Sequence, residues 1–173
     1  LTNLSELYLS NNQIGDIDKS LFEGLSKLTI LHLENNQIKY FHLTHQTQLV
    51  EIDLSNNFIG NIESSFFKNC PNLKRLFINN NNLVFENSNS FTGISTSLEY
   101  LDFSGNQFKG SFNFKLNNPI HIDLSFNSIS SATFEIKEII KDIRINLSSN
   151  RLEDLPKFIG SASAKKERNI TIN

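Results

Sequence analysis

The sequence lacks several features that would each place it in a particular class of protein. It has a single cysteine, Cys70, so an internal disulfide framework is excluded. No stretch approaches the roughly 18 consecutive apolar residues of a membrane span, and no signal peptide opens the chain. We therefore expect this segment not to insert directly into a membrane.

A surplus of positive charge and a glycine-rich phosphate loop are also missing. The formal net charge is -2, which argues against a sequence-independent hold on nucleic acid. Without a phosphate loop, we expect no cofactor. What is present is a chain of 173 residues with 38% apolar and 20% charged residues, which is within the range of one globular or solenoid domain.

A motif of eleven positions recurs along nearly the whole chain. In residues 28–38, LTILHLENNQI, aliphatic side chains occupy the first, fourth, sixth and eleventh positions and Asn36 occupies the ninth. The asparagines at the ninth position lie 21 to 25 residues apart; they are Asn12, Asn36, Asn57, Asn81, Asn106, Asn127 and Asn150. Self-similarity at this period predicts a solenoid.

The residue types in the motif explain how each copy folds. Leu31 and Leu33 alternate with His32, so a short strand buries the two leucines and turns His32 outward. One such strand cannot hide its apolar face alone, and stacking successive copies gives a parallel sheet. Where the backbone bends after the strand, an asparagine side chain can satisfy both an amide and a carbonyl group. We therefore predict that the seven asparagines form a buried ladder.

Aromatic residues recur in the segments that return from one strand to the next. Phe22, Phe67 and Phe91 occupy the same place in three copies, and we predict that such rings stack inside the return side as a spine. Cys70 fills a place that other copies give to leucine or isoleucine. It is predicted to be a buried apolar residue.

These copies resemble the leucine-rich repeat family. Residues 4–28, LSELYLSNNQIGDIDKSLFEGLSKL, resemble the typical subtype of extracellular Toll-like and Slit-like proteins, whereas residues 101–112, LDFSGNQFKGSF, resemble the subtype of plant receptors. The resemblance implies an α/β solenoid in the form of a right-handed horseshoe. A parallel β-sheet would line the concave face, and irregular or short 3-10 segments would return along the convex face.

The repeats extend to both ends of the chain. Residues 1–173 form a single domain fragment of about seven repeats, and Ile170 and Ile172 alternate as the strand of an eighth repeat that has only begun. Terminal repeats normally carry caps that cover the open edge of the sheet. We therefore expect both ends to be uncapped, with flanking repeats or caps of the same chain beside them.

The outward positions of the sheet offer a candidate binding surface. Neighbouring copies place equivalent side chains roughly 5 Å apart, which predicts one contiguous patch made of Arg75, Phe77, Tyr100, Asp102, His121 and Asp123. Aromatic side chains beside arginine and carboxylates are enriched at interface hot spots. The resemblance implies that a protein partner binds this concave sheet. The competing interpretation is a solvated face whose side chains pair with one another.

Catalytic and metal-binding interpretations are weak. His121, Asp123 and Ser125 all project from a flat sheet, where no enclosed pocket or oxyanion hole is expected. His42 and His45 lie three residues apart, but no nearby cysteine or carboxylate completes a metal site. The sequence therefore predicts no catalytic residues and no metal, and the chain is not expected to be an enzyme.

Two functions remain open. The first is a protein-recognition module of a larger extracellular or membrane-anchored receptor, which would place the chain outside the cell or at its surface. The second is an intracellular scaffold, or a structural subunit of a larger assembly, that uses the same face. Asn3, Asn146 and Asn169 begin N-x-S/T triplets and are possible glycosylation sites, but a sequence this rich in Asn, Ser and Thr would contain such triplets by chance.

Overall fold

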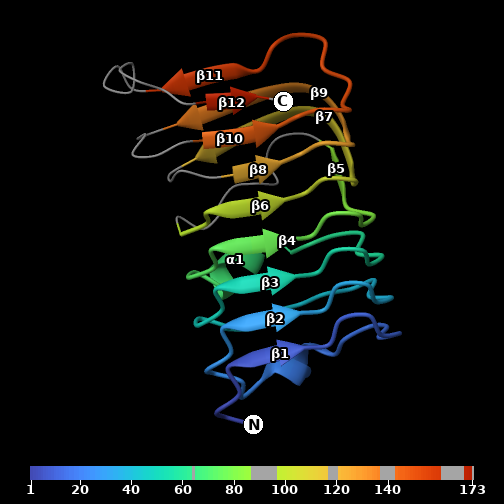
Figure 1. The fold of residues 1–173 in the computed structure, drawn as a ribbon, viewed down its shortest axis with the longest axis vertical. Coiled ribbons are helices and arrows are strands. Elements are labelled where there is room, and N and C mark those ends of the chain that lie inside the picture. Colours follow the sequence, from blue (N-terminus) through green and yellow to red (C-terminus); the bar gives the residue numbers. More distant parts are fainter. Residues whose placement is uncertain (64, 87–96, 117–120, 137–142, 161–169, 173) are drawn as a thin grey trace.

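The chain folds into a stack of similar coils, each of which adds one short strand to a common sheet (Figure 1). The computed structural model describes residues 1–63, 65–86, 97–116, 121–136, 143–160 and 170–172. The larger sheet is parallel, with the order β1-β2-β3-β4-β6-β8-β10-β12. Its strands are β1 (Glu6–Tyr8), β2 (Ile30–His32), β3 (Glu51–Asp53), β4 (Arg75–Phe77), β6 (Tyr100–Asp102), β8 (His121–Asp123), β10 (Ile143–Asn146) and β12 (Ile170–Ile172).

The register of this sheet follows the sequence motif. The fourth-position residues are aligned across neighbouring strands and point into the core; they are Leu7, Leu31, Ile52, Leu76, Leu101, Ile122 and Ile145. All of them except Leu7 are at most 1% exposed. The predicted parallel sheet is therefore confirmed, and its third and fifth positions form the concave face.

The return side of the first three repeats contains two short helical turns. The 3-10 helix η1 (Lys19–Phe22) begins after Asp18, whose carboxylate accepts the amide proton of Ser20 at 2.8 Å. The helix α1 (Phe66–Asn69) lies behind β3 and β4 (Figure 1). The segment η1 is a short 3-10 return of the predicted kind, whereas α1 is a single α-helical turn.

A spine of phenylalanine rings runs through these returns, with one change from the prediction. The ring of Phe41 lies 5.9 Å from that of Phe22 and 6.3 Å from that of Phe66. Phe66 therefore occupies the place predicted for Phe67, while Phe67 packs against Phe66 at 5.3 Å and is also buried. Phe91 lies outside the described residues.

From the fourth repeat onward the return side is a second parallel sheet. Its order is β11-β9-β7-β5, and its strands are β5 (Val84–Glu86), β7 (Gln107–Leu116), β9 (Ser128–Ile136) and β11 (Lys157–Gly160). Inside it, the rings of Phe112, Phe114, Phe134 and Phe158 stack in sequence, with centroids 5.2 to 6.1 Å apart. A continuous aromatic column therefore replaces the helical turns.

The period-two pattern of these segments explains the second sheet. In β7, Phe112, Phe114 and Leu116 are buried while the residues between them face out. The KGSF sequence departs from the earlier returns, and the register of β7 with β9 shifts between its Gly110 and Ser111, where Ser130 of β9 is skipped. Gly110 adopts a φ of 86°, which glycine tolerates at no steric cost.

The ladder asparagines tie each coil to the coil before it. Asn106 donates from Nδ2 to the carbonyl of Ile78 at 3.1 Å, and its Oδ1 accepts the amide proton of Leu83 at 3.0 Å. The same pair of bonds recurs at Asn36, Asn57, Asn81, Asn127 and Asn150.

Burial of the ladder differs between its middle and its ends. Asn36, Asn57, Asn81, Asn106 and Asn127 are buried, whereas Asn150 is half-buried and Asn12 is exposed. The prediction that all seven are buried is wrong for Asn12, because that side chain donates only to Leu9 and Ser10 of its own repeat.

Cys70 is buried, as predicted, and its thiol donates to the carbonyl of Phe66 at 3.0 Å. Burial raises the pKa of this thiol to about 12, so it stays protonated and unreactive at neutral pH. Within the described residues, no helix has the length and apolar character needed to cross a membrane.

Candidate recognition surface

The six residues of the predicted patch lie on three adjacent strands of the concave face. Arg75, Tyr100 and His121 are aligned in one row across β4, β6 and β8. Phe77, Asp102 and Asp123 are aligned in the next row. The structure therefore places the six residues at adjacent register positions of one face, and all of them are half-buried.

Three rings on these strands form an aromatic shelf, defined here as Phe77, Tyr100 and His121. The ring centroids of Phe77 and Tyr100 are 5.0 Å apart, and the imidazole of His121 meets the edge of Tyr100 at 4.8 Å. The rings are half-buried, so part of each ring stays exposed to solvent beside its contacts with the others. One side of the shelf is thus available to a partner.

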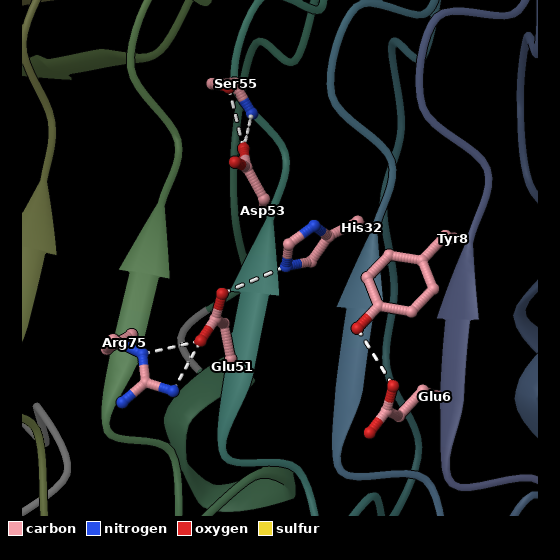
Figure 2. A network of polar contacts seen from close by, with 7 residues as sticks. All are labelled: Glu6, Tyr8, His32, Glu51, Asp53, Ser55 and Arg75. Atoms are coloured by element: carbon pink, nitrogen blue, oxygen red, sulfur yellow. Dashed lines mark hydrogen bonds and ion pairs between the residues drawn. The ribbon is translucent and has the colours of Figure 1, made fainter.

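Arg75 faces the opposite direction, toward the first half of the molecule. Its guanidinium binds the carboxylate of Glu51, which also contacts Nε2 of His32 at 3.0 Å (Figure 2). Burial alone would raise the pKa of Glu51, but the hydrogen bonds of Arg75 and His32 outweigh it and lower that pKa. The positive charge of Arg75 is therefore already paired with a carboxylate of the same chain.

The contacts of the concave face continue from His32 to the first strand. The ring of His32 meets that of Tyr8 at 5.0 Å, and the Tyr8 hydroxyl donates to Glu6 at 3.0 Å (Figure 2). Between β1 and β4 the competing interpretation, a face whose side chains pair with one another, describes the contacts well.

The acidic row, defined as Asp53, Asp102 and Asp123, occupies the fifth position of three repeats. Each carboxylate accepts two bonds from the serine two residues ahead, one from its amide and one from its hydroxyl. No lysine or arginine pairs with these three carboxylates among the described residues. Burial, with the neighbouring carboxylates Asp123 and Asp53, raises the pKa of Asp102 despite the bonds from Ser104.

Asn146 occupies the same position in the seventh repeat and makes the same turn. Its Oδ1 accepts from the amide and hydroxyl of Ser148 at 3.1 and 2.8 Å. Its Nδ2, the atom that would carry a glycan, donates to Asp123 at 2.9 Å. Of the other two triplets, Asn3 is exposed and accepts from Lys27, and Asn169 lies outside the described residues.

A second asparagine column, which the sequence analysis missed, runs along the rim at the eighth position. Asn11, Asn35, Asn56 and Asn80 all adopt left-handed backbone with φ of 53° to 57°. Asn35 donates to Asn11 at 3.0 Å and Asn80 donates to Asn56 at 2.9 Å. The signal was the repeated NN pair, in which the first asparagine suits the left-handed turn and the second is the ladder residue.

The same rim position is occupied differently in the later repeats. Gly105 adopts a φ of 63°, and a Cβ there would meet Oδ1 of Asn80. Phe126 has a φ of 54° with its ring 67% exposed, an unusual combination for a bulky residue.

The arrangement of polar groups does not match a catalytic or metal centre. The Ser125 hydroxyl donates directly to Asp123 at 2.6 Å, while the His121 ring packs against Tyr100, so no histidine is placed to activate the serine. His42 pairs with Glu63 at 2.9 Å. Over the described part of the chain, no three His, Cys, Asp or Glu residues gather as metal ligands would.

The sequence profile named leucine rich repeat matches residues 2–45 and 47–108, which is more than half of the chain. The chain belongs to the leucine-rich repeat family. Comparison with curated proteins found no match. The confirmed features of this leucine-rich repeat chain are its motif and its parallel sheet.

Several solved leucine-rich repeat structures share the fold. The LRIM1/APL1C complex matches with a TM-score of 0.64 at 19% identity, over 92% of this chain and 35% of that chain. The Toll–Spatzle complex of Drosophila matches with a TM-score of 0.57 at 20% identity, over 86% and 25%. The TLR13–ssRNA13 complex matches with a TM-score of 0.57 at 22% identity, over 98% and 27%. This chain thus spans about a third of the first of these chains and about a quarter of the other two.

Proposed function

We propose that this chain is a recognition module that binds a protein partner on its concave face, over the aromatic shelf of Phe77, Tyr100 and His121. The observation that carries the proposal is the chain of ring contacts at 5.0 and 4.8 Å across three adjacent strands. Aromatic rings held rigidly on strands offer a large contact area at little entropic cost. Concave sheets of repeat arrays are extended surfaces suited to such binding.

The related structures bear on the kind of partner and on the location of this chain. Two of the related structures are complexes between proteins, which supports a protein partner. The TLR13 structure contains single-stranded RNA, but the carboxylates of the acidic row do not suit a polyanion here. We place the chain in a larger extracellular or membrane-anchored receptor; the second candidate is an intracellular scaffold that uses the same shelf.

The double change Phe77→Ser with Tyr100→Ser tests the proposal. The immobilised chain would be exposed separately to culture medium and to cell lysate from its source, and captured proteins would be identified by mass spectrometry. We expect the double variant to lose a protein that the wild type captures, while melting at a modestly lower temperature because two ring contacts are lost. Capture from medium supports the receptor, and capture only from lysate supports the scaffold.

The matched control is Tyr8→Ser with Phe58→Ser. These two rings are 56% and 51% exposed and lie outside the patch, so the change removes the same types of side chain. Capture should survive in this control. Equal capture by wild type and shelf variant would refute the proposal.

A further inference from the structure

The charge of the concave face is distributed unevenly. At the third and fifth positions of the seven repeats stand five carboxylates and two guanidinium groups; these are Glu6, Glu51, Asp53, Asp102 and Asp123 against Arg75 and Arg144. The formal net charge of the whole chain is only -2, so the negative charge is concentrated on this face. A ligand that covers the face therefore meets an acidic surface.

Two of these carboxylates oppose each other directly. Asp102 and Asp123 are register partners on the adjacent strands β6 and β8. Like charges in such a cross-strand pair destabilise a sheet. No cation of the described chain relieves this pair, whereas Glu51 on β3 has both Arg75 and His32. The pair is therefore an unfavourable arrangement for the free protein.

The turn that these aspartates make does not require their charge. Asn146, at the same position of the seventh repeat, accepts the same two bonds from Ser148. An asparagine at position 102 would make the same turn without the repulsion, whereas at position 123 it would keep the turn but lose the bond that Asp123 accepts from Asn146. Local rules that are broken without benefit to the fold are expected at functional sites.

The aromatic shelf adjoins the pair. Tyr100 lies two residues before Asp102 on β6, so the two side chains are on the same face of the sheet. The Tyr100 ring contacts the rings of Phe77 and His121. A cation near a carboxylate pair and above a tyrosine ring gains both an ion pair and a cation–π contact. Asp102 keeps one carboxylate oxygen without a hydrogen-bond partner in the described chain.

We infer that the partner is a basic polypeptide segment, and that it places a lysine or arginine side chain between Asp102 and Asp123 while its apolar part covers Tyr100 and Phe77. The inference rests on the proposed function and specifies the chemistry of the partner. Charge complementarity selects this occupant, because an acidic or neutral segment would cover the two opposed carboxylates without supplying a cation.

A displayed library of random linear peptides tests the inference directly. The wild-type chain would be the bait, in buffer with EDTA so that no divalent ion can bridge the carboxylates. We expect the selected peptides to be enriched in lysine or arginine beside aromatic or aliphatic residues. Synthesised winners should bind at least about tenfold more weakly to the double variant Asp102→Asn with Asp123→Asn, and their affinity should fall with added salt.

The control variant is Asp16→Asn with Asp154→Asn, which makes the same change of net charge at two exposed loop positions away from the patch. It should change the affinity less than about threefold, since screened charges act only at short range. A cooperative melting curve close to that of the wild type would show that the test variant is folded, with a small loss expected from the bond between Asn146 and Asp123.

The outcomes separate the two proposals. Peptides that lack cationic residues, or that bind the Asp102→Asn, Asp123→Asn variant unchanged, overturn the inference. If such peptides still need Phe77 and Tyr100 for binding, the proposed function is retained and only the inference of a basic partner is rejected. If no peptide is enriched, or binding depends on neither the rings nor the carboxylates, both proposals fall.

Discussion

Glu51 and Asp102 project from the same concave face, but their surroundings are opposite. Glu51 is bound by Arg75 and His32, and its pKa is lowered. Asp102 has another carboxylate as its register partner, and its pKa is raised by burial and by Asp123. An acid whose charge is matched contributes to the fold, whereas an acid whose charge is unmatched is explained better by a partner.

The return side shows a parallel contrast between the first and later repeats. Repeats one and three return through η1 and α1 and repeat two through an irregular segment, with rings that meet edge-on or tilted, such as Phe22 against Phe41 at 63°. Repeats four to seven return through the second sheet, where Phe114 and Phe134 are stacked at 11°. Strand returns align the rings of successive coils because equivalent residues are in register.

The largest effect should come from opening the stacked column. Phe114→Ala leaves a cavity in a fully buried site and should lower the free energy of unfolding by about 3 to 5 kcal/mol. A urea titration measures it. The control Phe58→Ala, at a ring 51% exposed, should stay within about 0.5 kcal/mol of the wild type. A similar loss for both variants would contradict the buried column.

The asparagine ladder offers the next largest effect. Asn106→Ala removes bonds to Ile78 and Leu83 in the preceding coil and should cost about 1 to 3 kcal/mol, because those backbone groups become unsatisfied. Asn12→Ala makes the same chemical change at an exposed residue that bonds only within its own repeat. It should cost no more than about 0.5 kcal/mol. Equal shifts of the urea midpoint would refute the role of the ladder between coils.

The sequence predicted the concave side far better than the return side. The motif fixes which residues of each strand point inward, so the register of Leu76 and Leu101 and the neighbours of the patch followed from spacing alone. The returns vary in length and lack a fixed motif. Phe66 and Phe67 are adjacent in the sequence, and either ring could have filled the place in the spine. In the structure it is Phe66 that packs against Phe41.

Two other features needed the structure for different reasons. The alternation in residues 112–116 is typical of a strand, which the expected irregular returns did not include. The sequence did not predict which carboxylates of the patch are paired, because Arg75 could form an ion pair with either Asp102 or Glu51, and the structure places it on Glu51. Both carboxylates lie on strands adjacent to the strand of Arg75, so the repeat spacing does not distinguish them.

Rim position eight gives a smaller effect of opposite sign. Asn11, Asn35, Asn56 and Asn80 occupy its left-handed backbone in the first four repeats, but Phe126 does so in the sixth. Phe126→Asn should raise the free energy of unfolding by about 1 kcal/mol, since asparagine tolerates this conformation better than a bulky residue. Thermal unfolding would measure the gain. The reverse change Asn56→Phe should be destabilising by a similar amount, and a loss of stability in Phe126→Asn would show that the ring is held by packing.

The smallest effect, and the one that addresses the opening contrast most directly, is the pH dependence of stability. The pKa of Glu51 is lowered by folding, so its contribution is present above the unfolded value of about 4.5 and is lost as pH falls through the folded pKa. The pKa of Asp102 is raised above its ordinary 3.8, so its ionisation opposes folding at neutral pH and that penalty disappears as pH falls through the folded pKa. Urea midpoints measured from about pH 3 to pH 7 should therefore diverge for two matched variants. Glu51→Gln should be less stable than the wild type at pH 7 and approach it in acid, whereas Asp102→Asn should be at least as stable as the wild type at pH 7 and lose that advantage in acid. If both variants were destabilised at neutral pH, Asp102 would belong to the fold in the same way as Glu51, and the unmatched pair would no longer indicate a basic partner.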